Sequence, residues 1–196
     1  DQLQGSQESD RDELCKWIRS ITKSRSSSEE KWLGERNMID LCDVVKKYYY
    51  HPYTGGSNSI KKVLPAILNE SSMLQRKYSN PIYGSKAIVS KNYSNWQWIE
   101  KNSAGNVKDP YKLLPTIFNG IDTSKLDLLM GSDELADGGA AMTAYAKMQF
   151  TEMCDSESEM VASALLKYCE LDTFAMVLLY EYWADLVGES VIEEAA

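Results

Sequence analysis

The segment from about residue 156 to residue 187 constrains this chain most, because it is apolar nearly all round and long enough for one helix. A helix of that kind is expected to be buried over most of its surface. Asp172 interrupts it, in the stretch LLKYCELDTFAM of residues 165–176. At the three-and-four spacing of a helix, Asp172 shares a face with mostly apolar residues: Leu165, Tyr168, Cys169, Met176, Leu179 and Trp183.

Asp172 is therefore predicted to point where a core side chain belongs. A carboxylate removed from water costs several kcal/mol unless it is paired, hydrogen-bonded or bound to a metal. One interpretation is a buried or half-buried acid that an arginine, a lysine or backbone donors satisfy. The other is an acid that binds a metal ion.

The composition is that of a soluble globular protein with one sizeable core, since 43% of the 196 residues are hydrophobic and 26% are charged. An apolar run of membrane-spanning length is absent, and the N-terminus lacks the pattern of a signal peptide, so we expect a cytoplasmic protein with no membrane segment. The four cysteines show no zinc-ligand spacing, which favours reduced thiols. His51 is the single histidine, so Ser-His or Cys-His catalysis would have only this residue as its base.

The net charge of −8 hides a polarised chain. Between Ile60 and Lys101 there are seven basic residues and two acids, whereas from Glu152 to the end there are eleven acids and one base. Aromatic residues are interleaved with the basic ones, as in a groove that binds nucleic acid by stacking bases: Tyr78, Tyr83, Tyr93, Trp96 and Trp98. The alternative is an aromatic core with a solvated basic rim.

Periodicity and turn residues predict a mostly helical chain. Besides the long segment, helices are expected over three ranges: residues 9–22, 59–71 (kinked at Pro65) and 134–153. Two short strands are expected, at residues 38–41, leading into a further helix, and at 86–90. A flexible connector is expected at 23–30 and a loop at 51–59. Residues 78–120 are expected to be irregular but well packed.

Tyr168 and Asp172 form Tyr-x-x-x-Asp, which places a phenol and a carboxylate side by side, one helical turn apart. Such a pair could hold a metal ion and a water molecule together. Taken alone, the pattern is weak, because it recurs by chance in many proteins of this size.

Four segments together are more specific: GSNSIKKVLPAIL, DPYKLLP, GGAAMTAYAKMQF and ALLKYCELDTFAMVLLYEYW. In that order they resemble a bacterial family of uncharacterised proteins whose C-terminal region looks like a ribonuclease H-like exonuclease of the DEDD type. The resemblance covers roughly residues 36–187 and implies an α/β, ribonuclease H-like fold. It implies the tyrosine form of the third exonuclease motif, with Tyr168 positioning water and Asp172 as a ligand of Mg²⁺ or Mn²⁺ in a two-metal site.

The chain also departs from that pattern. It has no Asp-x-Glu on a strand, two candidate strands where the fold needs about five, and Asp1 in place of an initiating Met. We therefore expect an incomplete fold that lacks the first strands. Residues 1–31 would be an N-terminal helix and connector, and residues 32–196 the C-terminal part of a nuclease domain whose N-terminal half lies elsewhere in the parent protein.

Four more residues are candidate site residues because of where they stand in the sequence. Lys61 and Lys62, after the glycine loop, are candidates for phosphate contacts, or else a solvated helix face. Asp40 and Asp43 are candidates for the surroundings of the site; the alternative for either one is a helix cap or a surface acid.

Two functions follow from these expectations. The first is part of a metal-dependent nuclease, a 3′ to 5′ exonuclease acting on DNA or RNA, with this chain inactive by itself. The alternative is a catalytically inactive interaction module of the same fold, whose acidic C-terminal region suits a basic protein partner.

Overall fold

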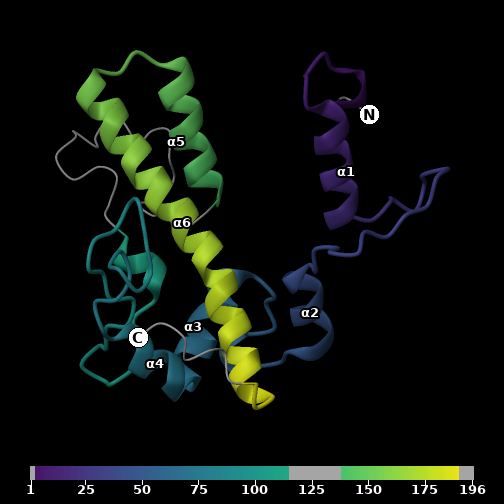
Figure 1. Cartoon of the computed structure of the whole chain (residues 1–196). Helices are drawn as coiled ribbons and strands as arrows, with labels where there is room; N and C mark the ends of the chain where they lie inside the picture. The colour runs from purple at the N-terminus through teal and green to yellow at the C-terminus, as the bar shows by residue number, and fades with distance from the viewer. Residues whose placement is uncertain (1–2, 115–137, 190–196) are drawn as a thin grey trace. The chain divides into compact units, whose positions relative to one another are not determined.

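The computed structural model describes residues 3–114 and 138–189 (Figure 1). The chain divides into two compact units, Asp1–Lys47 and Tyr48–Ala196, whereas the sequence analysis placed a boundary after residue 31. The described residues are mostly helical, with isolated bridges but no strand among them. None of the described helices combines the length and apolar character needed to cross a bilayer.

The first unit contains helix α1 (Arg11–Ile21), as predicted, after a 3₁₀ turn, η1 (Leu3–Gly5). The predicted connector is closed by an antiparallel bridge between Lys23 and Leu33. The predicted strand at residues 38–41 is wrong. The Asp40 carboxylate accepts a hydrogen bond from the Cys42 amide at 2.8 Å, and helix α2 (Leu41–Tyr48) begins there instead.

The second unit is organised on helix α6 (Asp155–Leu186), whose bounds match the prediction closely. Helix α5 (Gly138–Phe150) forms a hairpin with α6, and this agrees with the helix predicted at 134–153, of which residues 134–137 lie outside the described residues. Helices α3 (Ile60–Glu70) and α4 (Ser72–Tyr78) contact α6 farther along its length (Figure 1). Two 3₁₀ turns complete the unit: η2 (Pro52–Thr54) and η3 (Pro110–Leu113).

Local chemistry sets where α3 and α4 begin and end. The predicted loop before α3 is confirmed, with Gly55 and Gly56 both at positive φ, and Pro65 lies inside α3. The buried Ser71 separates the two helices, and its hydroxyl oxygen accepts a hydrogen bond from the Leu74 amide at 3.1 Å. This side-chain cap starts α4 directly after α3 ends.

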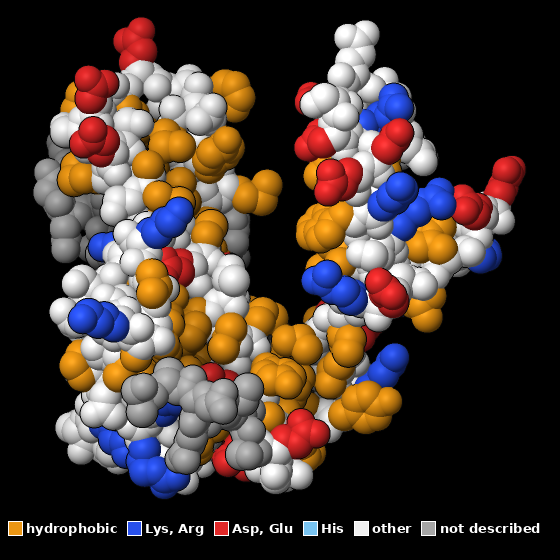
Figure 2. Space-filling view, viewed as in Figure 1, with side chains coloured by type: hydrophobic (Ala, Val, Ile, Leu, Met, Phe, Trp, Pro, Cys, Tyr) orange, Lys and Arg blue, Asp and Glu red, His pale blue; other side chains and the backbone are white. Residues whose placement is uncertain are grey.

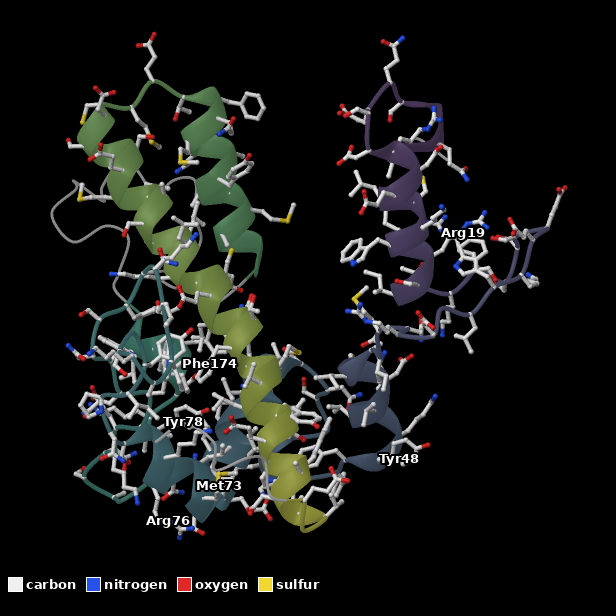
Figure 3. The ribbon with its side chains drawn as sticks, viewed as in Figure 1. Arg19, Tyr48, Met73, Arg76, Tyr78 and Phe174 are labelled. Atoms are coloured by element: carbon white, nitrogen blue, oxygen red, sulfur yellow. The ribbon has the colours of Figure 1, made fainter. Side chains whose placement is uncertain are left out.

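The core lies where α3, α4 and the later turns of α6 meet an irregular segment, residues 79–109. That segment is well packed, as expected, because its Tyr83 and Trp98 rings pack on Phe174 of α6. Tyr93 packs on both of these rings, and Tyr78, at the end of α4, also packs on Phe174, with ring centroids 4.5–6.0 Å apart throughout. All four of these side chains are buried: Tyr78, Tyr83, Tyr93 and Trp98. Figure 3 shows Tyr78 facing Phe174, while Arg76 points away.

The aromatic residues of the basic region are therefore core residues, which leaves the buried ones unable to stack on bases. Five of the seven basic residues of this region are exposed: Lys62, Arg76, Lys86, Lys91 and Lys101. The alternative interpretation, an aromatic core with a solvated rim, is confirmed for this region.

The predicted strand at residues 86–90 is wrong, since Ile88 forms only an isolated bridge with Tyr83. The chain turns sharply at Gly84, which has a φ of 71° and packs directly against the Tyr93 carbonyl. A Cβ atom at this position would lie 2.1 Å from that carbonyl oxygen. A glycine at residue 84 is thus required for the close approach as well as for the backbone conformation.

We expect Gly84→Ala to lower the free energy of unfolding by about 2–4 kcal/mol, because it adds a backbone clash to the strain of a positive φ. Gly105→Ala is the matched control, since Gly105 has a φ of 82° with open space around it. It should cost only about 1 kcal/mol. Denaturant unfolding measures both, and equal losses would show that the contact with Tyr93 is unimportant.

Candidate functional site

Asp172 lies at the edge of the buried face of α6 and is half-buried. The centre of that face is formed by other residues: Ala164, Tyr168, Leu171, Ala175, Leu178 and Tyr182. The predicted stripe was therefore partly wrong, because Cys169 is exposed. A helix that is apolar nearly all round does not reveal from sequence which arc faces the core.

The carboxylate of Asp172 is satisfied by a phenol. The hydroxyl of Tyr111, in η3, donates to Asp172 Oδ1 at 2.6 Å. Tyr111 is 4% exposed, and its burial, together with the hydrogen bond to Asp172, raises the pKa of its phenol above the ordinary value. The phenol therefore stays protonated and remains a donor. The expectation of a satisfied, half-buried acid is confirmed, but the donor is neither a basic side chain nor the backbone.

Tyr168 and Lys61 lie against the same tyrosine. The Tyr168 ring centroid is 6.1 Å from that of Tyr111. The Lys61 ammonium lies 5.5 Å from the centroid of Tyr111 and 5.3 Å from that of Tyr168, within the range of a cation–π contact. Three residues singled out from sequence, Tyr168, Asp172 and Lys61, are thus gathered around a fourth, Tyr111.

Sequence reasoning missed Tyr111, although it stands in one of the four segments that carry the family resemblance, DPYKLLP. Its position is set locally by Asp109, whose carboxylate accepts from the Tyr111 amide at 3.1 Å, and by Pro110 at the start of η3. A proline-initiated turn after a capping acid is a readable signal. Its partner on α6, 61 residues later, is not readable from local pattern.

The remaining candidates lie elsewhere. Lys62 is exposed on α3. Asp40 and Asp43 belong to the first compact unit and are described with it alone. Asp40 caps α2, and Asp43 lies 3.6 Å from the ammonium of Lys46, so each has the local role that the sequence analysis gave as its alternative.

Two other carboxylates of α6, those of Glu170 and Glu181, also accept hydrogen bonds from tyrosine hydroxyls. Tyr83 donates to Glu170 at 2.8 Å, and Asn92 donates to the same carboxylate at 2.5 Å. Tyr78 donates to both oxygens of Glu181 at 3.0 Å. Glu181 is only 7% exposed, so it is the buried acid of this helix, and sequence analysis missed it.

Burial of the Glu181 carboxylate is offset further by the Lys77 ammonium at 2.9 Å. The signal was present in the sequence, because Glu181 stands three residues after the core residue Leu178 and seven after Phe174. Burial, followed by the nearby carboxylate, raises the pKa of the Tyr78 phenol above its ordinary value, so this tyrosine also remains a donor.

Within residues 3–114 and 138–189, no group of three or more His, Cys, Asp or Glu side chains is arranged to hold a metal ion. Asp172 supplies one carboxylate, of which one oxygen already accepts a hydrogen bond. A two-metal site at this position would need further carboxylates.

Comparison of the chain with protein-family models, with curated proteins and with solved structures gives no match.

We expect Tyr111→Phe to lower the free energy of unfolding by about 1–2 kcal/mol, because it removes the hydrogen bond to a half-buried carboxylate and keeps the ring. The control is Tyr180→Phe, at an exposed tyrosine of α6, the helix that carries Asp172, which should change stability by less than about 0.5 kcal/mol. Denaturant unfolding at neutral pH compares the two. Equal effects would remove the structural role assigned to this hydroxyl.

The lowered pKa of the Glu170 carboxyl predicts that the free energy of unfolding depends on pH. Partial burial raises the pKa of its carboxyl, but hydrogen bonds from Ser90, Asn92 and Tyr83 outweigh it and hold the pKa below the ordinary 4.5. The unfolded chain then binds this proton at a higher pH than the folded chain. The stability that Glu170 contributes is present above about pH 4.5 and is lost as the pH falls through the lower folded value.

Unfolding measured at about pH 7 and about pH 3 tests this, because Glu170→Gln should lose less stability between the two than the unsubstituted chain. Glu159→Gln, a change at an exposed acid earlier on α6, should leave the acid dependence unchanged. If Glu170→Gln retains the full loss, the hydrogen bonds to this carboxylate do not favour its ionised form.

Proposed function

We propose that this chain is part of a metal-dependent nuclease that cleaves phosphodiester bonds, with Tyr168 and Asp172 as its contribution to the active site. The observation that carries the proposal is the meeting of three segments at one place. Lys61, Tyr111 and the Tyr168, Asp172 pair come from three of the four segments on which the family resemblance rests.

The chemistry of these groups suits the proposal. Asp172 is half-buried, and one of its oxygens is oriented by Tyr111, which leaves the other for a cation. Tyr168 lies one turn earlier on the same helix, and Lys61 brings a positive charge that suits a phosphate group. A divalent Mg²⁺ or Mn²⁺ ion would supply a bound water of lowered pKa.

The proposed active site also needs carboxylates beyond that of Asp172. The resemblance implies an Asp-x-Glu and another acid, and these carboxylates would come from the N-terminal half of a ribonuclease H-like parent domain. The substrate would be DNA or RNA, and the polarity implied by the resemblance is 3′ to 5′.

A second function, an inactive interaction module of the same fold, is favoured by a different observation. The hydrogen bond from Tyr111 gives Asp172 a structural role that needs no metal. Such a module would bind neither Mg²⁺ nor Mn²⁺ and would keep its function in Asp172→Asn.

The test is Mn²⁺-dependent degradation of 5′-labelled single-stranded DNA and RNA by the parent protein that contains this chain. We expect Asp172→Asn to slow shortening from the 3′ end at least about 100-fold, because a carboxylate ligand is lost. Tyr168→Phe should slow it about 10-fold or more, because the hydroxyl beside the ligand is lost. Asp185→Asn, at an exposed acid of the same helix, is the control and should leave the rate unchanged.

Activity that survives Asp172→Asn would refute the assigned role of this residue. A folded parent protein that degrades neither substrate with either metal ion would instead support the inactive module. Calorimetric titration with Mn²⁺ separates the two functions independently of turnover.

A further inference from the structure

His51 caps the turn η2 with its ring. Nδ1 of the imidazole accepts a hydrogen bond from the Tyr53 amide at 3.1 Å, and the His51 carbonyl accepts from the Thr54 amide at 3.1 Å and from the Thr54 hydroxyl at 2.8 Å. An amide donates only to a nitrogen with a free lone pair, so Nδ1 carries no proton in this arrangement. The neutral ring therefore holds its proton on Nε2.

The other ring nitrogen faces a carboxylate. Nε2 lies 3.5 Å from Glu70 Oε2, at the end of α3, and the Tyr182 hydroxyl of α6 donates to the same oxygen at 2.7 Å. The side chains of His51 and Glu70 are 25% and 48% exposed, so solvent reaches both. The imidazole thus has an amide donor on one side and a carboxylate on the other.

Two tyrosine rings pack on the imidazole. The centroid of Tyr49 lies 6.3 Å away with 9° between the ring planes, and that of Tyr53 lies 6.3 Å away at 48°. Tyr49 also packs on Tyr182 and Trp183 of α6. Figure 2 shows hydrophobic side chains, with tyrosines coloured among them, gathered over the later turns of this helix. These contacts hold the plane of the imidazole, so each nitrogen keeps its own partner.

The titratable groups around the ring and its carboxylate partner come from several elements: Tyr49 from the segment before η2, Tyr53 from η2, Glu70 from α3 and Tyr182 from α6. Burial raises the pKa of the Tyr49 and Tyr182 phenols above the ordinary value, so both stay protonated at neutral pH. An imidazole is the side chain whose charge ordinarily changes between about pH 8 and about pH 5. A proton that this group takes up in that range goes to Nδ1 of the imidazole.

Protonation changes what His51 can bind. An N–H on Nδ1 would face the Tyr53 N–H, so two donors would meet at 3.1 Å and the hydrogen bond is lost. The positive ring is at the same time attracted to Glu70, 3.5 Å from Nε2. The chain after the turn has room to move, because Gly55 and Gly56 have open space around them.

We propose that His51 is a pH-sensitive switch in the segment that leads into α3. Near neutral pH its ring holds the Tyr53 amide and closes η2. On protonation it releases this amide and forms an ion pair with Glu70, and residues 52–59 loosen. One interaction replaces another, so the stability of the unit changes little while the loop before α3 loses order.

This switch is independent of the proposed nuclease, because it uses neither Tyr168 nor Asp172. It gives a role to the single histidine of the chain, which the proposed nuclease does not use. Its moving part includes the side chain of Tyr53, which is 64% exposed. Acid would thus change the position of an aromatic ring on the surface of the second unit.

Hydrogen exchange of backbone amides, measured by NMR on the 196-residue chain, tests the switch. Protection factors are compared, since they correct for the dependence of intrinsic exchange on pH. Protection of the Tyr53 amide should fall about 3- to 10-fold between about pH 7.5 and about pH 5.5, because one hydrogen bond is lost. The Leu74 amide is the internal control and should keep its protection, because its acceptor, the Ser71 hydroxyl, does not titrate.

Two substitutions at residue 51 separate the loss of the acceptor from the packing of the ring. In His51→Asn the side-chain oxygen accepts from the amide and does not titrate, so protection at Tyr53 should be equal at both pH values. His51→Phe keeps a ring without an acceptor, and protection at Tyr53 should be low at both.

Glu70→Gln tests the ion pair. Protonation of the imidazole then loses the amide bond and gains no attraction, so acid should lower the midpoint of denaturant unfolding more than in the unsubstituted chain. The control, Glu159→Gln at an exposed acid of α6, should respond to acid as the unsubstituted chain does. Equal responses of the two variants would overturn the partnership with Glu70. The proposal is also overturned if protection at Tyr53 does not change with pH, or if it changes alike in His51→Asn.

Discussion

Hydrogen bonds from buried tyrosine hydroxyls to acceptors on α6 hold the second unit together. Four tyrosines that precede the helix in sequence make them. Tyr83 donates to Glu170, Tyr111 to Asp172 and Tyr78 to Glu181, while Tyr93 donates to the Lys167 carbonyl at 3.1 Å. A phenol suits this position because its ring adds to the apolar core while its hydroxyl satisfies an acid at the edge of that core. The long helix can thus carry acids on its inner side without a matching set of basic residues.

These bonds explain how residues 79–114 stay ordered with little regular secondary structure. A segment of this kind gains few backbone hydrogen bonds from a sheet or helix, so its position must be set by side chains. Its rings pack around Phe174, and its hydroxyls fix their register along α6. The candidate site follows from the same arrangement, because Tyr111 brings η3 to Asp172 and places its own ring beside Tyr168 and Lys61.

The positions of the helices could be predicted well from the sequence, but the residues that contact them could not. The bounds of α6 follow from its continuous apolar character, and Asp172 was correctly expected to need a donor. Tyr111 could not be chosen as that donor, because local periodicity carries no information about a contact 61 residues distant. The strands expected at residues 38–41 and 86–90 failed for different reasons. In the first, the Asp40 cap favours a helix, and in the second, the apolar residues serve a packed loop.

Helix α6 is continuous over 32 residues, but it is anchored unequally along its length. Past Tyr168 it is fixed by large rings and by phenol–carboxylate bonds, whereas its first turns rest on a small cluster of Ala144, Val161 and Ala164. Because fewer large side chains hold the early turns, we expect their backbone amides to exchange with solvent faster than those of the later turns. One helix therefore joins a firmly anchored half, which holds the candidate site, to a half whose anchoring depends on small side chains.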